Sequence, residues 1–289
     1  MKLCGHCHRA LEEGSDWRCP FCHWQAAVLN GWPAFAPELA QGGAGFHVEG
    51  FEELAGAEQG SFWFRSRNQL ILWALRTYFP SAQSFFEVGC GTGFVLSAVA
   101  AANPGMRLAG SEIFAEGLRF AAQRLPGVEL MQMDARTIPF VDEFDVIGAF
   151  DVLEHIAEDE VVLGEMFRAL KPGGGLLVTV PQHMFLWSAT DEQACHARRY
   201  SAPELRAKVG RAGFEVLRQT SFVSLLLPAM LLTRRKKKIR RESIASCELQ
   251  LPKLLNSMLG QIMRCEHFLI RQGASLPCGG SLLLVAGKP

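Results

Sequence analysis

Hydrophobic and polar positions follow a repeated strand–helix pattern along most of the chain. Short apolar runs typical of buried β-strands alternate with longer segments in which apolar residues recur at helical spacing. We expect strands over residues 84–88, 107–111, 128–133, 144–150, 176–181, 214–220 and 281–286. We expect helices over residues 61–79, 94–102, 114–124, 159–170 and 202–212. This alternation predicts a doubly wound α/β fold, in which a mainly parallel sheet has helices on both faces.

A different pattern precedes this domain, because four of the nine cysteines lie within the first 22 residues. They form two Cys-x2-Cys units, Cys4 with Cys7 and Cys19 with Cys22. Two tight turns of this kind present four thiolates to one ion, which is typical of a closed, structural Zn²⁺ site. Since so short a segment cannot build its own core, the metal would supply much of its folding free energy. We therefore expect a small zinc ribbon over residues 1–28.

Residues 29–60 are rich in Gly, Ala and Pro, with a Gly-Gly-Ala-Gly run at 42–45. Such a composition does not easily hold regular structure. We interpret this stretch as a linker between the zinc ribbon and a catalytic domain over residues 61–289.

Composition narrows the class of protein. The chain has 289 residues, of which 49% are hydrophobic and 20% charged, an ordinary globular mixture. The 29 basic and 29 acidic residues give a net charge of zero, which argues against a uniformly basic nucleic-acid binder. No apolar run reaches the length of about 18 residues that a membrane span needs, and the polar, cysteine-rich start does not resemble a signal peptide. We expect a protein of the reducing cytoplasm.

The candidate chemistry lies where the expected strands end, the edge at which such sheets bind ligands. The first strand runs into a glycine-rich turn at residues 87–93, with glycines at 89, 91 and 93. A dinucleotide fingerprint needs a further glycine at position 94, where this chain has Phe94. Acidic residues follow at the ends of the next three strands, namely Glu112, Asp134 and Asp151.

These motifs, with "FDVLEHI" at 150–156 and "LKPGG" at 170–174, resemble in order those of class I S-adenosylmethionine-dependent methyltransferases. The resemblance implies a Rossmann-like, seven-stranded methyltransferase sheet and S-adenosylmethionine as cofactor. An arginine of the preceding helix, Arg65 or Arg67, would meet the methionine carboxylate. The other cofactor contacts that the resemblance implies are Glu87, Gly89, Gly91 and Gly93 at the methionine and ribose, Cys90 beside them, Glu112 at the ribose, Ile113, Asp134 and Ala135 at the adenine, and Asp151 near the methionine.

The segment 187–200 is dense in polar and aromatic residues and resembles a "D…H…RRY" loop of methyltransferases found near bacterial polysaccharide and lipid genes. We expect His196 to act as a general base and Asp191 to orient it, with His155 in a more architectural role. The residues expected at the substrate, with Arg198 and Arg199 binding an anionic group, are His183, Trp187, Arg198, Arg199 and Tyr200. The alternative is a loop held by internal ion pairs.

About 60 residues, 221–280, separate the last two expected strands and form a helical insertion. An apolar run at 222–232 is followed by seven cationic residues in the eight positions 234–241. Residues 222–241 are suited to lie in the interface of an anionic membrane. A nucleic-acid contact or a solvated face are alternatives, and the apolar run favours a membrane over RNA.

The leading hypothesis is methyl transfer to an amphiphilic or lipid-linked small molecule, of saccharide or isoprenoid type, by a peripheral protein at the cytoplasmic membrane face. One alternative is an RNA base methyltransferase that uses the zinc ribbon and the basic run to bind RNA. Another is a non-catalytic zinc-ribbon scaffold, against which the intact cofactor acids argue. The acceptor atom and the oligomeric state are left open by the sequence.

Overall fold

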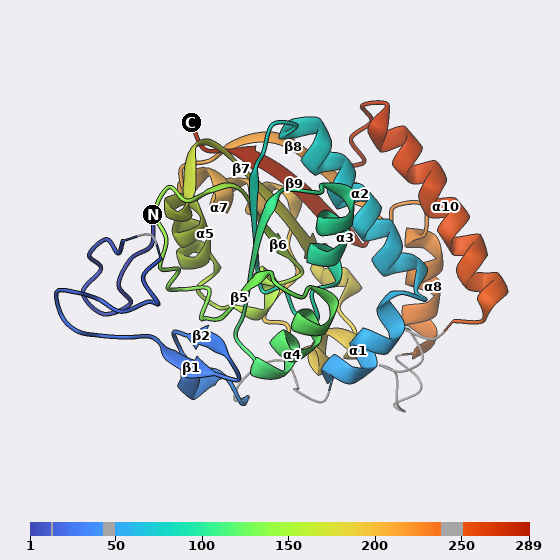
Figure 1. The fold of residues 1–289 in the computed structure, drawn as a ribbon. Coiled ribbons are helices and arrows are strands. Elements are labelled where there is room, and N and C mark those ends of the chain that lie inside the picture. Colours follow the sequence, from blue (N-terminus) through green and yellow to red (C-terminus); the bar gives the residue numbers. More distant parts are fainter. Residues whose placement is uncertain (13, 43–49, 238–250) are drawn as a thin grey trace.

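The computed structural model describes residues 1–12, 14–42, 50–237 and 251–289. Its centre is one mixed sheet with the strand order β1-β2-β5-β4-β3-β6-β7-β9-β8 (Figure 1). The strands are β1 (Ala27–Leu29), β2 (Trp32–Ala34), β3 (Ser84–Val88), β4 (Arg107–Glu112), β5 (Glu129–Gln132), β6 (Phe144–Phe150), β7 (Leu170–Pro181), β8 (Glu215–Phe222) and β9 (Ser281–Gly287). Strands β2 to β7 are parallel along this order, and β9 runs antiparallel between β7 and β8. The expected doubly wound, Rossmann-like fold is confirmed, with its seven strands in the run from β5 to β8.

Helices cover both faces of this sheet (Figure 1). The α-helices are α1 (Gly50–Glu58), α2 (Phe62–Tyr78), α3 (Phe94–Ala102), α4 (Ala115–Arg124), α5 (Asp159–Ala169), α6 (Ala189–Gln193), α7 (Ala202–Arg211), α8 (Leu227–Lys237) and α10 (Lys253–Arg271). Short 3-10 turns are η1 (Pro37–Leu39), η2 (Leu153–His155) and η3 (Met184–Leu186). Side chains of α5 and α7 share one buried cluster with the sheet, and those of α2, α3, α4 and α10 share the other. The core therefore has two layers, one on each side of the strands.

The stretch expected to be a linker, residues 29–60, is largely part of the folded domain, so this expectation is wrong. Strand β2 pairs in parallel with β5 through Ala34 and Gln132, and extends the sheet at its edge. Helix α1 follows at 50–58 and buries Phe51 against Phe114. The short elements escaped detection because a few large apolar side chains stabilise them in a segment dominated by Gly and Ala. Residues 43–45 of the glycine-rich run lie outside the described residues.

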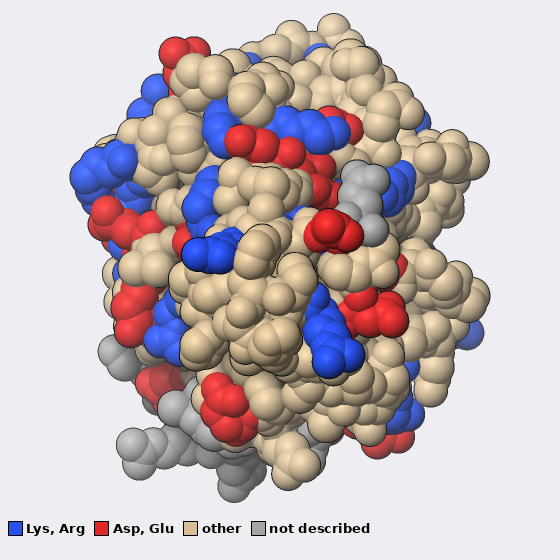
Figure 2. Space-filling view, turned by 60° about the vertical axis from the view of Figure 1, so that its left-hand side comes forward, with Lys and Arg blue, Asp and Glu red and all other residues tan. Residues whose placement is uncertain are grey.

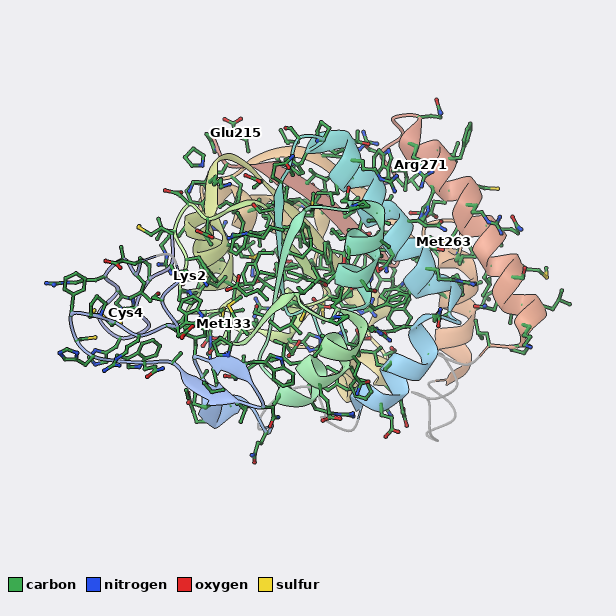
Figure 3. All side chains as sticks on the ribbon, in the orientation of Figure 1. Lys2, Cys4, Met133, Glu215, Met263 and Arg271 are labelled. Carbon is green, nitrogen blue, oxygen red and sulfur yellow. The ribbon has the colours of Figure 1, made fainter. Side chains whose placement is uncertain are left out.

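The cysteine-rich module before β1 packs onto the same edge of the domain. Lys2 forms an isolated antiparallel bridge with Phe140, and the Leu3 N–H donates to the Pro139 carbonyl at 2.9 Å. The buried Trp17 ring meets Phe140 edge-on, at 5.5 Å between ring centroids. Figure 3 shows Cys4 within this module, with Lys2 between it and the sheet. The module is thus joined to the catalytic domain by core contacts.

The insertion before β9 contributes α8 and α10 to the opposite end of the molecule (Figure 1). Helix α10 lies against α2 and buries Met263 and Ile270. The basic run at 234–241 falls partly outside the described residues, since 238–250 are not described. In the described part of the chain, no helix is both long enough and apolar enough to span a bilayer.

Candidate active site

The turn between β3 and α3 forms a narrow backbone cradle. Gly89, Gly91 and Gly93 all have positive φ angles, of 68°, 52° and 74°, which residues with a side chain rarely adopt. A Cβ atom on Gly89 would lie 2.5 Å from Val152 Cγ2, so a side chain has no room there. The glycines are therefore needed both for the turn and for the close approach of η2 behind it. This leaves bare backbone facing the carboxyl ends of the strands.

Glu112 joins the end of β4 to this cradle. Its carboxylate accepts hydrogen bonds from the backbone N–H groups of Gly91 and Ile113, both at 2.9 Å, and of Phe114 at 3.2 Å. Burial raises the pKa of Glu112 above its usual value, and these three hydrogen bonds oppose that shift. Glu112 thus orders the turn, while Ile113, half-buried, follows at the rim.

Of the two arginines expected here, Arg67 faces the cradle, whereas Arg65 is exposed. Arg67 is 7% exposed, forms an ion pair with Asp151 and lies over the Trp63 ring. The positions differ because Arg67 falls on the buried stripe of α2, while Arg65 is on the opposite side. The Thr179 hydroxyl also donates to Asp151, at 3.2 Å, and holds it at the end of β6.

Glu87 lies beneath this pair and is buried in β3. Burial raises the pKa of Glu87 well above the usual range, and the charge of Arg67 opposes the shift. Its Oε2 atom has no hydrogen-bond partner among the described residues. A buried carboxylate oxygen without a partner is costly, so the cradle fits a ligand with hydrogen-bond donors or a positive charge. Cys90 lies beside it, buried, and burial raises the pKa of its thiol well above the usual value, which makes it a packing group.

The end of β5 bears Asp134 and Ala135, both half-buried. Asp134 forms an ion pair with Arg136 at 2.7 Å and accepts the backbone N–H of the same residue. Burial alone would raise the pKa of Asp134, but the hydrogen bonds from Arg136 lower it below the usual value. Asp134 is thus ionised and oriented at the carboxyl edge of the sheet.

A second polar group adjoins this cradle and combines η2 with the loop after α6. His196 Nδ1 lies 2.9 Å from Asp191 Oδ1, and Arg199 Nε donates to the same oxygen at 2.6 Å. Although burial opposes it, these two partners lower the pKa of the Asp191 carboxyl far below its usual value. An ionised carboxylate only accepts hydrogen bonds, so Nδ1 of His196 is the donor to Asp191 and Nε2 is the ring nitrogen left for another partner. The structure therefore contains the expected hydrogen bond between Asp191 and His196.

The Nε2 atom faces Glu154 and His155. Glu154 Oε1 is 4.0 Å from it, and the His155 and His196 ring centroids are 4.7 Å apart. One ligand atom from each of these three residues lies within 4.8 Å of the others. Burial lowers the pKa of His155 to about 4, so its imidazole is neutral near pH 7. We call these three residues the Glu154 cluster.

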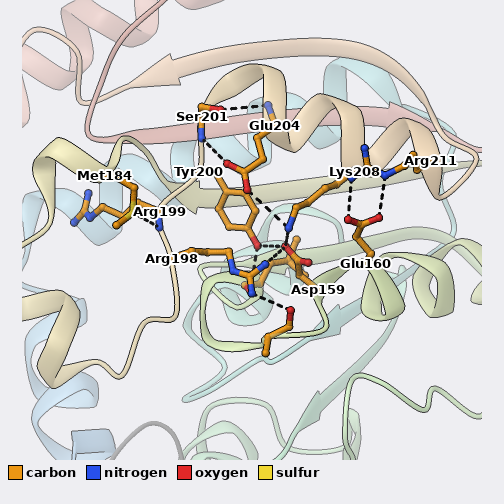
Figure 4. Close-up of polar contacts among 12 residues, drawn as sticks. Asp159, Glu160, Met184, Arg198, Arg199, Tyr200, Ser201, Glu204, Lys208 and Arg211 are labelled. Carbon is orange, nitrogen blue, oxygen red and sulfur yellow. Dashed lines mark hydrogen bonds and ion pairs between the residues drawn. The ribbon is translucent and has the colours of Figure 1, made fainter.

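Three residues expected at the substrate hold the loop instead, and Figure 4 shows two of them, Arg198 and Tyr200, at Asp159. Arg199 is buried between Asp191 and the Gln182 carbonyl. Arg198 contacts Asp159 at 3.0 Å, and the fully buried Tyr200 donates to the same carboxylate at 2.6 Å. The expectation that the two arginines bind an anion and that Tyr200 meets substrate is wrong, because internal carboxylates already engage these side chains. The alternative of a loop held by ion pairs describes them.

The other two expected substrate residues remain accessible at the rim. His183 has a positive φ of 64°, stacks on Phe185 and places Nε2 3.1 Å from the Cys278 thiol. Trp187 is half-buried after η3. Both lie on the loop after β7, at the carboxyl edge of the sheet, where an acceptor would enter.

Sequence reasoning missed the helix that covers the cradle. Phe51 of α1 approaches Gly91, and Glu58 at the end of α1 accepts from Thr92 at 2.6 Å and pairs with Arg124. The lack of a side chain at Gly117 allows this packing, because a Cβ there would lie 3.0 Å from Phe51 Cε1. The only signal was an amphipathic "FEEL" segment, and it follows residues of loop-like composition.

The four N-terminal cysteines converge as expected. The Sγ atoms of Cys4 and Cys22, and those of Cys7 and Cys19, are 3.6 Å apart, and all four lie within 4.8 Å of one another. Tetrahedral Zn²⁺ with bonds of about 2.3 Å places its sulfurs about 3.8 Å apart. The Cys7 N–H also points at Cys4 Sγ, at 3.4 Å. The donor set therefore fits a structural Zn²⁺ ion, which these thiolates would enclose on all four sides.

Comparisons with known proteins agree with this geometry. Residues 86–178 match the family model described as "Methyltransferase domain". A probable S-adenosylmethionine-dependent methyltransferase of Mycolicibacterium smegmatis is 28% identical over 172 residues, which cover 58% of this chain and 65% of that protein. Phthiotriol/phenolphthiotriol dimycocerosates methyltransferase 1 of Mycobacterium ulcerans is 31% identical over 159 residues, covering 52% and 58%. The match thus spans less than two thirds of the length of either curated relative.

Solved structures share the fold. An S-adenosylmethionine-dependent methyltransferase from Thermotoga maritima superposes with a TM-score of 0.52 at 18% identity, covering 84% of this chain and 96% of that one. Phosphoethanolamine N-methyltransferase 2 of Haemonchus contortus gives 0.51 at 19% identity, covering 77% and 52%. The matched domain and the curated relatives, together with the strand order and the glycine cradle, support a class I S-adenosylmethionine-dependent methyltransferase, and the solved structures share its fold.

Proposed function

We propose that this protein transfers a methyl group from S-adenosylmethionine to an amphiphilic or lipid-linked small molecule. The observation that carries the proposal is the pairing of two neighbouring sites. One is the glycine cradle, with the unpartnered Oε2 of Glu87 and the Arg67–Asp151 pair. The other is the Glu154 cluster, and the charge of Asp151 acts on both Glu154 and His155. An acceptor at that cluster would lie next to the methionine end of the cofactor.

The residues present fit the cofactor that the family uses. Glu87 and Asp151 would bind the ammonium group of the methionine portion, and the Arg67 guanidinium its carboxylate. Glu112 would accept the ribose hydroxyls, while Asp134, with Ile113 and Ala135, would meet the adenine. The backbone at Gly89, Gly91 and Gly93 allows the close approach. Helix α1 would exclude water from above.

When bound, S-adenosylmethionine would supply an electrophilic methyl group on its sulfonium. In the transfer, the acceptor atom bonds to the methyl carbon while the S–CH₃ bond breaks and leaves its electron pair on sulfur. The acceptor also loses a proton. The chain's own task is to align the acceptor and to favour loss of that proton. Asp191 holds His196 so that Nε2 points at the acceptor side. In the simplest form of the proposal, that nitrogen takes the proton, with His155 packed against it.

The proposed acceptor class rests on helix α10, which carries a second apolar stripe opposite its buried one. Leu254, Met258, Phe268 and Leu269 fall within an arc of about 100° on one side of the helix and are all exposed. Leu232 of α8 adds a further exposed apolar side chain ahead of the basic run. An exposed apolar stripe of this kind, joined in sequence to cations, suits the interface of an anionic membrane. We propose that the protein binds the membrane peripherally through α8, α10 and the basic run, on the cytoplasmic side.

On the face shown in Figure 2, acidic and basic side chains are interspersed, which lends no support there to an extended RNA-binding surface. We therefore do not propose RNA as the acceptor, and the labelling experiment below includes an RNA fraction to test it.

The test incubates the protein with methyl-labelled S-adenosylmethionine and separate membrane-lipid, RNA and small-metabolite fractions. The proposal predicts label in the lipid fraction, loss of that label with Arg67→Met, and retention with Arg65→Met. Label confined to RNA would refute the acceptor class while leaving methyl transfer intact. Absence of label from every fraction, in a protein that binds the cofactor, would refute the proposed reaction for these acceptor classes.

A further inference from the structure

The Glu154 cluster contains a buried carboxyl group whose environment the methyltransferase fold alone does not explain. Glu154 is 0% exposed, and neither of its carboxylate oxygens has a hydrogen-bond partner among the described residues. Two guanidinium groups are near enough to act on its charge, those of Arg67 and Arg199. Each is directed elsewhere, because Arg67 pairs with Asp151 and Arg199 with Asp191.

Of these three carboxyl groups, Glu154 is therefore the one with neither a hydrogen bond nor an arginine partner among the described residues. Leaving a buried carboxyl group without hydrogen bonds is unfavourable. The Nε2 atom of His196 lies 4.0 Å from Glu154 Oε1, which is beyond hydrogen-bond distance. A gap therefore remains between the Glu154 carboxyl group and the rings of His155 and His196.

The geometry points to a divalent metal site at this gap: we propose that Glu154, His155 and His196 bind one divalent transition-metal ion, distinct from the zinc of the N-terminal module. A carboxylate with two imidazoles suits Mn²⁺, Fe²⁺, Co²⁺ or Zn²⁺ better than Mg²⁺ or Ca²⁺. Ligand atoms about 2.1 Å from a tetrahedral ion lie about 3.4 Å apart. The observed separations, all within 4.8 Å, need closure by about an ångström.

The surroundings support ligand binding. Asp191 accepts from the other ring nitrogen of His196, the carboxylate–histidine–metal arrangement that fixes the tautomer of a metal-binding imidazole. The Ala197 N–H donates to the Glu154 carbonyl at 2.7 Å, which ties the loop that bears His196 to the backbone of η2. Three protein ligands leave coordination positions open.

This inference rests on the proposed function for what fills those positions, namely an oxygen donor of the acceptor. A hydroxyl bound to such an ion loses its proton more readily, to water, and becomes the nucleophile. The lone pair of His196 then binds the metal and does not take the proton directly. The acceptor is accordingly an oxygen nucleophile, such as a phenol, an enol or a sugar hydroxyl.

The experiment is a Mn²⁺ titration of the full-length protein, purified with its zinc, followed by electron paramagnetic resonance of free Mn²⁺. The four-thiolate site disfavours Mn²⁺, so the titration reports the second site. We expect one Mn²⁺ bound per chain. Glu154→Gln and His196→Gln should weaken binding at least about 100-fold, and Asp191→Asn about 10- to 100-fold. Glu192→Gln, at an exposed position of α6 next to Asp191, is the matched control and should bind as the wild type does.

Thermal melting shows that each variant is folded before its titration is interpreted. Absence of saturable Mn²⁺ binding by the wild type, or equal binding by Glu154→Gln, overturns the metal site and leaves Glu154 as a buried neutral acid. Calorimetry of S-adenosylmethionine on the same samples separates the two proposals. Cofactor binding without Mn²⁺ binding refutes only the metal site, whereas Mn²⁺ binding without cofactor binding refutes only the proposed function.

Discussion

Replacing Arg67 with Met tests whether this buried arginine supports both the fold and the cofactor site. The change keeps much of the side-chain volume but removes the ion pair with Asp151. It leaves that carboxylate near Glu87 and Glu154, whose charged forms Arg67 also stabilises. Breaking a buried pair by removing one partner costs about 3–5 kcal/mol. Because the Asp151 side chain is 19% exposed, water solvates part of the charge that Arg67 no longer pairs with. We therefore expect Arg67→Met to cost about 2–4 kcal/mol of stability.

The assay is urea unfolding at pH 7, together with calorimetric titration of S-adenosylmethionine. Arg67→Met should lower the free energy of unfolding by that amount and weaken cofactor binding about tenfold or more, since a hydrogen-bonded charge is lost. Arg65→Met is the control, because it changes the same residue type on the exposed side of α2, and it should stay within about 0.5 kcal/mol. Adding Asp151→Asn to Arg67→Met should recover part of the lost stability. Equal effects of the two arginine variants would refute the assignment of Arg67 to the cradle.

Three further outcomes are expected. Cys19→Ala should release zinc, measured by metal analysis, and expose Trp17, seen as a red shift of its fluorescence; a protein that keeps its zinc would contradict the four-thiolate site. Burial lowers the pKa of His267 to about 4 in the folded protein. Below about pH 6.5, His267 therefore binds a proton in the unfolded chain but not in the folded one. The wild type should therefore lose stability relative to His267→Phe by about 1.4 kcal/mol per pH unit from about pH 6 toward 4. If the free energies of unfolding of the two proteins, measured in urea, differ by the same amount at pH 7 and pH 5, this prediction is wrong. The pair Met258→Asp and Phe268→Asp should weaken binding to anionic vesicles in a sedimentation assay, unless α10 lies away from the membrane.

The arrangement of strands could be predicted because each buried strand is a short apolar run bounded by turn residues. Gly89 and Glu112 could be assigned because the turn and the strand end place them without reference to any other part of the chain. The choice between Arg65 and Arg67 was also accessible, since Phe64, Arg67 and Ile71 share one helical stripe that excludes Arg65.

The loop before α7 shows why other assignments failed. Polar density alone does not reveal whether a side chain faces a ligand or an internal partner. Arg199 and Tyr200 turn inward because Asp191 and Asp159, the latter distant in sequence, lie beneath them. The approach of His196 to Glu154 likewise depends on a tertiary contact across about 40 residues of chain. Helix α1 was missed because its burial depends on Phe51 reaching a glycine turn elsewhere.

The most direct test of the central claim is calorimetric titration of the purified full-length protein with S-adenosylmethionine and, separately, with S-adenosylhomocysteine. The account predicts one site per chain for each, competition between them, and loss of binding with Gly89→Val, whose side chain would occupy the place of Val152. A folded wild-type protein that binds neither compound at millimolar concentration would contradict it.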